Sequence, residues 1–266
     1  MIRIALERHD DVTRVRLSHW RSRLAGYEVS AYLYRGVLVD SGFPAAAEAV
    51  TRLARERGVA AALITHHHED HSGGAHSLAA AGIPLGMAPA VQRLVAPGDP
   101  IPLYRRVVWG DPLPLGSVSP APPVPGLEMI PAPGHSSDHH VVWDAERRTL
   151  FGGDLFLGVK VRVAHPEEDP RLLVRTLRRI AALEPARLFD AHRGSIATPA
   201  VALRLKADWI EGIITAVDDR IARGWSDRAI RRELLGREPF STYVSRGEYG
   251  KLNFIAAIRH GAPIAG

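Results

Sequence analysis

Cysteine is absent from the sequence. This absence excludes disulfide bonds and thiolate metal sites, so a bound metal would need nitrogen and oxygen ligands. Long apolar runs are also missing, because none approaches the roughly 20 residues that cross a bilayer. Residues 1–8 lack the apolar core and small-residue cleavage site of a signal peptide. We therefore expect a cytoplasmic protein with no membrane partner.

Basic runs interleaved with aromatic residues, which are typical of nucleic-acid binding, are missing as well. The net charge is +5, but nearly all of the positive charge is arginine that is mixed with acids. We therefore expect a small-molecule substrate, a protein that does not bind nucleic acid, and a monomer or homodimer. The length of 266 residues suits one large α/β domain or one domain with an appendage.

One short stretch concentrates the residues that can bind a metal. Four histidines and two acids lie between His66 and His71, directly after the apolar residues 59–64. Residues 59–64 predict a buried strand, and alternation along an extended chain places His66 and His68 on one face. Asp70 and His71 come where the chain turns into a helix, so the spacing suits two neighbouring metal ions. The alternative is a solvated loop with a fortuitous histidine run. Further ligand residues elsewhere in the chain would favour the metal site over this alternative.

The rest of the chain predicts strands alternating with helices. Gly36 marks a hairpin, Pro44 begins a helix that ends at Gly58, and proline-rich residues 96–126 predict edge strands and loops. Further expected strands are residues 27–33, 37–39, 127–130, 141–143, 149–151 and 187–190. Further expected helices are residues 75–81, 170–183, 199–224, 227–235 and 247–260, with Ser226 as an N-cap.

Four more candidate ligands follow predicted strands: Asp40, His135, Asp154 and His192. In layered α/β folds, ligands bind at the carboxyl ends of the strands. Five strand ends would therefore converge on one site. Unrelated surface histidines would not show this repeated placement.

These motifs resemble a known family. His66-x-His68-x-Asp70-His71, Pro-Gly-His135, Gly-Gly-Asp154 and Ala-His192-Arg-Gly are similar, in this order, to the motifs of the metallo-β-lactamase-fold hydrolases, in particular glyoxalase-II-like members. Asp40 in Val-Asp-Ser-Gly resembles the family's first acidic motif, and the resemblance covers about residues 25–195. It implies an α/β fold, a four-layer αβ/βα sandwich of two mixed β-sheets with outer helices. Residues 1–200 would form this catalytic domain, and residues 201–266 a helical C-terminal segment packed beside the active site.

The resemblance also implies a role for each ligand. His66, His68 and His135 would hold one divalent metal ion, Asp70, His71 and His192 a second, and Asp154 would bridge them. Asp40 would fix the orientation and tautomer of a ligand histidine. The ligands suit zinc, with manganese or iron as alternatives. A hydroxide between the metals would attack the substrate, and Asp70 would orient this nucleophile and carry a proton as the catalytic residue.

Several other polar residues are expected to lie outside the ligand set. His67 should face away from the metals, His139 and His140 are expected to be structural, and Glu69 is expected to be exposed. By analogy with glyoxalase-II-like members, Tyr249, Lys251 or Asn253 would touch substrate. Arg193 stands where a glycine is commoner in the family, and we expect it to lie near the site and bind substrate, the alternative being that it only alters the turn. The alternative for residues 243–253 is a capping loop before the last helix.

The expected reaction is hydrolysis of an ester-type bond, such as a thioester or lactone. Asp154 distinguishes the chain from the true β-lactamases of the family, which lack that bridging aspartate. Lactonases of the family place a tyrosine shortly after this aspartate, whereas Leu155, Phe156 and Leu157 follow it here. The alternative is hydrolysis of a phosphodiester, as in a nuclease, on the same two metals. No inserted RNA-binding arm supports it.

Overall fold

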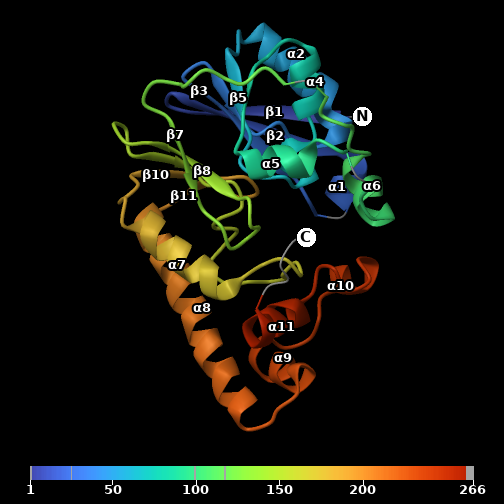
Figure 1. The fold of residues 1–266 in the computed structure, drawn as a ribbon, viewed down its shortest axis with the longest axis vertical. Helices are drawn as coiled ribbons and strands as arrows, with labels where there is room; N and C mark the ends of the chain where they lie inside the picture. Colours follow the sequence, from blue (N-terminus) through green and yellow to red (C-terminus); the bar gives the residue numbers. More distant parts are fainter. Residues whose placement is uncertain (1, 25, 99, 117, 262–266) are drawn as a thin grey trace.

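Two mixed β-sheets face each other in the computed structural model, which describes residues 2–24, 26–98, 100–116 and 118–261 (Figure 1). The first sheet has the order β1 (Ile2–His9), β2 (Val12–His19), β3 (Val29–Tyr34), β4 (Val37–Val39), β5 (Ala61–Leu63) and β6 (Leu85–Gly86). The second has the order β11 (Gly194–Ile196), β10 (Arg187–Asp190), β9 (Thr149–Phe151), β8 (His140–Asp144) and β7 (Glu128–Pro131). Parallel pairing joins β4, β5 and β6 in the first sheet, and β9 and β10 in the second.

The alternation of side chains along β3 explains the layers. Tyr32 and Tyr34 point to the second sheet, where Tyr32 packs on Phe189 with ring centroids 5.4 Å apart. Val29 and Ala31 point the other way, into the core beneath the helices of the first sheet. The expected hairpin around Gly36 is therefore confirmed, with β3 paired to β4.

Helices form the two outer layers. The core of the first sheet includes buried residues of α2 (Ala47–Glu56), α4 (Ala75–Ala80) and α5 (Pro89–Val95). The core of the second sheet includes those of α7 (Pro170–Ala181) and α8 (Pro199–Ala222). The predicted four-layer sandwich with a helical C-terminal extension is confirmed.

The C-terminal helices share the core of the second sheet. Ile210 of α8, Ile230 of α9 (Asp227–Leu235) and Phe254 of α11 (Lys251–His260) are buried in one cluster with Leu150 of β9. Ser226 caps α9 as expected, accepting a hydrogen bond from the amide of Ala229. The division proposed after residue 200 falls inside α8 and stays a prediction.

Four short helices were not expected. They are α1 (Trp20–Leu24), α5, α6 (Leu103–Trp109) and α10 (Phe240–Val244). The prediction of only edge strands and loops for residues 96–126 is wrong at α6, which begins after Pro102 and ends at Gly110 with φ +95°. Trp109 anchors α6 because its ring packs 5.1 Å from that of Phe43. Within the described ranges, no helix has both the length and the apolarity needed to cross a membrane.

Candidate metal centre

The histidine-rich motif begins in the loop after β5, which carries His66 and His68, and continues into the short helix α3 (Glu69–Ser72), which carries Asp70 and His71. Its predicted partners lie in loops that follow three strands of the second sheet: His135 after β7, Asp154 after β9 and His192 after β10. The amide of His140 donates to the carbonyl of Thr65, so the two sheets are joined directly at this edge. The structure brings all seven predicted ligands together.

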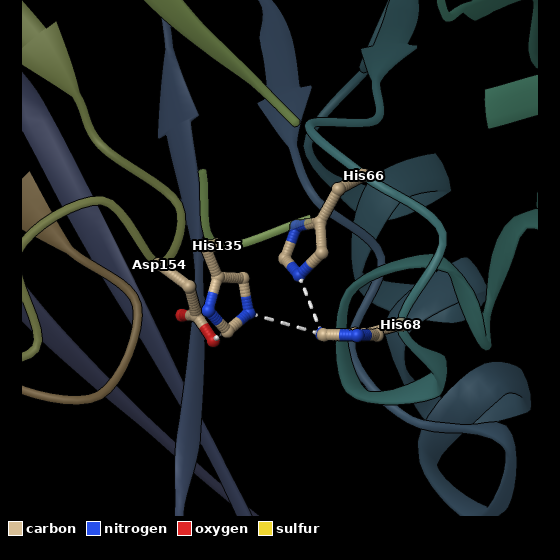
Figure 2. A group of neighbouring side chains, drawn as sticks. All are labelled: His66, His68, His135 and Asp154. Carbon is tan, nitrogen blue, oxygen red and sulfur yellow. Dashed lines mark hydrogen bonds and ion pairs between the residues drawn. The ribbon is translucent and has the colours of Figure 1, made fainter. Parts of the chain in front are cut away.

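The first group consists of His66, His68, His135 and Asp154, all buried, with one ligand atom of each within 4.8 Å of the others (Figure 2). His68 Nδ1 lies 3.0 Å from His66 Nε2 and 3.1 Å from His135 Nε2. Asp154 Oδ2 lies 3.4 Å from His135 Nε2. Three ring nitrogens and one carboxylate oxygen therefore converge on one point.

The second group consists of Asp70, His71 and His192. His192 Nε2 lies 3.3 Å from Asp70 Oδ2 and 3.4 Å from Asp154 Oδ1. Asp154 Oδ1 also lies 3.3 Å from His71 Nε2. Asp154 thus directs one carboxylate oxygen to each group, as a bridging ligand would.

Two buried atoms test whether metal ions fit these groups. His71 Nε2 and Asp154 Oδ1 are buried and have no hydrogen-bond partner among the described residues. Buried polar atoms are nearly always satisfied, so such atoms call for an explanation. Both atoms face the second group, and a cation held there would satisfy them. The residues fit a pair of divalent cations.

Four of the five ligand histidines are held by hydrogen bonds on the ring nitrogen that faces away from the centre. His71 Nδ1 donates to Asp40 Oδ2 at 2.9 Å, so Asp40 lies where the sequence analysis expected it. The other close partners are Thr65 Oγ1 on His66 at 3.0 Å, Glu167 Oε1 on His68 at 2.5 Å and the carbonyl of Glu28 on His192 at 2.8 Å. Such contacts fix the tautomer that presents a lone pair to a metal.

The acids of the centre keep their charge. Burial opposes ionisation of Asp154, but His192 and His71 hold the pKa of its carboxyl well below the usual range. Burial also opposes the charged form of His71, which lowers its pKa. The carboxylates of Asp154, Asp70 and Asp40 have the larger effect and raise the pKa of His71 well above its usual value. The buried carboxylates of the site therefore stay ionised and favour positive charge beside them.

Sequence reasoning missed several supporting residues. Glu167, which binds His68, lies 99 positions away along the chain. His139 accepts a hydrogen bond from the amide of Asp154 at 3.1 Å and donates to the carbonyl of Ala132, so its expected structural role is confirmed. His67 faces away from both groups as expected and is bound to Asp138 at 2.9 Å. The pair of acids at positions 167 and 168 was the only sequence signal for Glu167.

The expectation that Glu69 is exposed is wrong. Glu69 is 5% exposed and forms a two-bond ion pair with Arg105 of α6. The prediction failed because it did not include α6, which covers this position.

Of the four residues expected to touch substrate, three donate hydrogen bonds to backbone carbonyls among the described residues and the fourth, Tyr249, does not. Lys251 donates to the carbonyls of Leu235 and Arg237, Arg193 donates to the carbonyl of Leu157, and Asn253 donates to three carbonyls. Tyr249 lies with its ring 5.7 Å from that of His165. Burial raises the pKa of Tyr249 well above its usual value, and the carboxylates of Glu69 and Asp70 add to this effect. Of the four, Tyr249 is the one held close to the metal centre with no hydrogen bond to a backbone carbonyl.

Comparison with known proteins finds a matching family model and several similar proteins. A family model described as the Metallo-beta-lactamase superfamily matches residues 25–192. The "Beta-lactamase-like protein 2 homolog" of Caenorhabditis elegans is 26% identical over 192 residues, 69% of this chain and 61% of that protein. A "Hydroxyacylglutathione hydrolase" of Rhodospirillum rubrum is 36% identical over 115 residues, 42% of this chain and 40% of that protein. "Thioesterase pkgB" of Emericella nidulans is 27% identical over 196 residues, 68% of this chain and 52% of that protein.

The matches thus span about two fifths to three fifths of these relatives. A solved structure, "Metallo-beta-lactamase from Pontibacter korlensis", superposes with a TM-score of 0.59 at 17% identity. The superposition covers 79% of this chain and 99% of that chain. This structural likeness shows the shared fold.

Proposed function

This chain belongs to the metallo-beta-lactamase superfamily, and from that membership and the geometry of its metal centre we propose that it is a two-metal hydrolase of small-molecule thioesters or related esters. The observation that carries the proposal is Asp154, whose two oxygens face one ligand group each. Support for the substrate class comes from relatives named hydroxyacylglutathione hydrolase and thioesterase.

The chain's residues divide between two cations. His66, His68 and His135 would hold one, and Asp70, His71 and His192 the other, with Asp154 shared. Five imidazoles and two carboxylates suit zinc, which we propose as the native metal, with manganese and iron as the other outcomes of a metal analysis. Such a pair, when bound, lowers the pKa of water and polarises a carbonyl oxygen.

Asp70 is the side chain that we propose to move the proton. Burial opposes its ionisation, but His71 and His192 lower the pKa of its carboxyl, so it is ionised at neutral pH. An ionised carboxylate accepts a hydrogen bond from the attacking water and orients it, and can then pass the proton to the leaving group. Tyr249 is proposed to contact the substrate from the C-terminal side.

The cationic groups beside the centre favour an ester over a phosphodiester. Arg105 is bound to Glu69 and Glu248, and His165 to Glu248. These cations are already paired with acids, so they are poor partners for a polyanionic backbone. Phosphodiester hydrolysis is therefore the alternative outcome of the test.

A substrate panel tests the proposal. Zinc-loaded protein would receive a thioester, a lactone and bis(p-nitrophenyl) phosphate, and we expect cleavage of the thioester or the lactone. Asp70→Ala should lower kcat/KM by about 100-fold or more, a typical cost of losing a catalytic acid-base group. His135→Ala should also lower kcat/KM, because it removes a metal ligand. Asp208→Ala, at an exposed position of α8, is the matched control. Cleavage of the phosphodiester alone overturns the ester proposal. Unchanged turnover in both variants would show that the metal centre is not the active site.

A further inference from the structure

Two short helices beside the metal centre expose their apolar faces to solvent. On α10, Phe240 is 81% exposed, Tyr243 72% and Val244 50%, and spacings of three and four residues place them on one face. On α6, Leu103 is 71% exposed and Val107 44%, again four residues apart. We call these five side chains the apolar rim. A surface that concentrates large apolar groups in this way commonly marks a binding site.

Hydrogen bonds connect both helices to the wall of the metal centre. Tyr104 and Arg105 of α6 donate to Glu248 at 2.5 and 2.9 Å, and Glu248 follows α10 by four residues. Thr242 of α10 donates to the carbonyl of Tyr249 at 2.8 Å. Both helices lie on the same side of the molecule (Figure 1).

Arg105 completes the connection to the ligand residues. It pairs with Glu69, whose neighbour in the chain is the ligand Asp70. The apolar rim is thus tied through Arg105, Glu248 and Tyr249 to the loop that carries the metal ligands.

The charged groups at this wall are paired with one another. Arg105 lies between Glu69 and Glu248, and His165 contacts Glu248 at 2.9 Å and Glu167 at 3.2 Å. The sequence of α10, Phe-Ser-Thr-Tyr-Val, carries no charge at all. The surface next to the centre therefore suits an uncharged, apolar group better than an ionic one.

We propose that the apolar rim of α6 and α10 binds an apolar acyl chain, so that the preferred substrates are thioesters or esters of medium-chain or longer acyl groups. This inference rests on the proposed ester hydrolysis and narrows its substrate class. Each methylene that leaves water on binding strengthens the interaction by up to about fourfold. The apolar rim is an open surface that only partly covers each methylene, so we expect the increase in affinity to accumulate over several methylenes.

A chain-length series tests the proposal. Zinc-loaded protein would be assayed with acetyl, butyryl and octanoyl thioesters of N-acetylcysteamine, below the concentration at which they form micelles. We expect kcat/KM for octanoyl to exceed that for acetyl by roughly tenfold or more. In the double variant Phe240→Ser/Tyr243→Ser, the octanoyl-to-acetyl ratio should fall towards one. Val201→Ser/Leu205→Ser, at exposed positions of α8 (48% and 50%), is the matched control and should keep the wild-type ratio.

A binding measurement separates this inference from the proposed function. Calorimetry with the non-hydrolysable S-octyl and S-ethyl thioethers of N-acetylcysteamine should show tighter binding of the octyl compound, lost in the Phe240→Ser/Tyr243→Ser variant. If thioesters are cleaved with a flat chain-length profile, the apolar rim is not an acyl site, while ester hydrolysis stands. If no ester is cleaved, the proposed function fails. Equal binding of the two thioethers would show that the apolar rim does not bind an acyl chain.

Discussion

Glu167 decides which nitrogen His68 presents to the metal centre. Its carboxylate accepts a hydrogen bond from Nε2 at 2.5 Å, which leaves Nδ1 as the atom that faces His66 and His135. Without that acceptor, either tautomer becomes available and the ring is free to turn. A residue with no direct place in the ligand set thus controls one of the ligands.

Replacing Glu167 by alanine should weaken metal binding by about 10- to 100-fold, the usual cost of removing a group that orients a metal ligand. Glu167→Gln keeps an acceptor oxygen and should restore part of the affinity. Competition with a chromophoric chelator measures the effect. Glu146→Gln, at an exposed turn, is the control, and an alanine variant with wild-type affinity would contradict this role.

At the scale of elements, the metal loop is positioned by a close approach of two backbone segments. A Cβ atom on Gly74 would lie closer to the carbonyl oxygen of Ser41 than real side chains tolerate. Ser41 in turn donates from its amide and its hydroxyl to the carbonyl of the ligand His71. The glycine therefore keeps the loop after β4 against α3.

Gly74→Ala should lower the free energy of unfolding by about 1–3 kcal/mol, because the added methyl group separates the two segments. Denaturant unfolding of metal-free protein provides the measurement. Gly212→Ala is the matched control, since a Cβ there meets nothing within 4 Å in the middle of α8. That control should raise stability by roughly 0.5–1 kcal/mol, and an equal gain at Gly74 would refute the packing argument.

Helix α8 is joined to the Asp154 loop by a buried lysine. Lys206 is 3% exposed and donates to the carbonyls of Leu155 and Phe156 at 3.0 and 2.5 Å. Burial lowers the pKa of Lys206 to about 8, against the partly opposing effect of Glu168, Asp190 and Asp154. The long C-terminal helix thus contacts the chain directly after a predicted ligand.

Lys206 should make stability depend on alkaline pH. Between pH 8 and 10.5 the unfolded chain holds a proton that the folded protein has lost, so the free energy of unfolding rises with pH in this window. Comparing wild type with Lys206→Met should show this rise, on the order of 2–3 kcal/mol, in wild type alone. Exposed Lys160→Met should keep the wild-type slope, and parallel curves for wild type and Lys206→Met would contradict the assignment.

Several short helices were not predicted from the sequence. Helix α9 was expected at its observed bounds, residues 227–235, because Ser226 caps it and an amphipathic pattern follows. Helices α1, α5, α6 and α10 have five to seven residues, and their sequences show no clear helical period. They depend on contacts such as Trp109 on Phe43, which no local pattern reveals.

At the scale of the whole molecule, the predicted ligands could be found from sequence because each follows a strand. Strand ends of one layered fold converge, so Asp40, His135, Asp154 and His192 could be grouped by their positions along the chain. The partners that orient them could not be grouped, because pairs such as Glu167 with His68 and Arg105 with Glu69 depend on loops and helices far apart in the chain.

The central claim is that Asp154 joins two metal sites in one centre. Anomalous diffraction from crystals of the zinc-loaded protein, recorded above and below the zinc absorption edge, tests it most directly. The account predicts two peaks, one within the group of His66, His68 and His135 and one within the group of Asp70, His71 and His192, with the Asp154 carboxylate between them. A single peak, or peaks outside these groups, would contradict it.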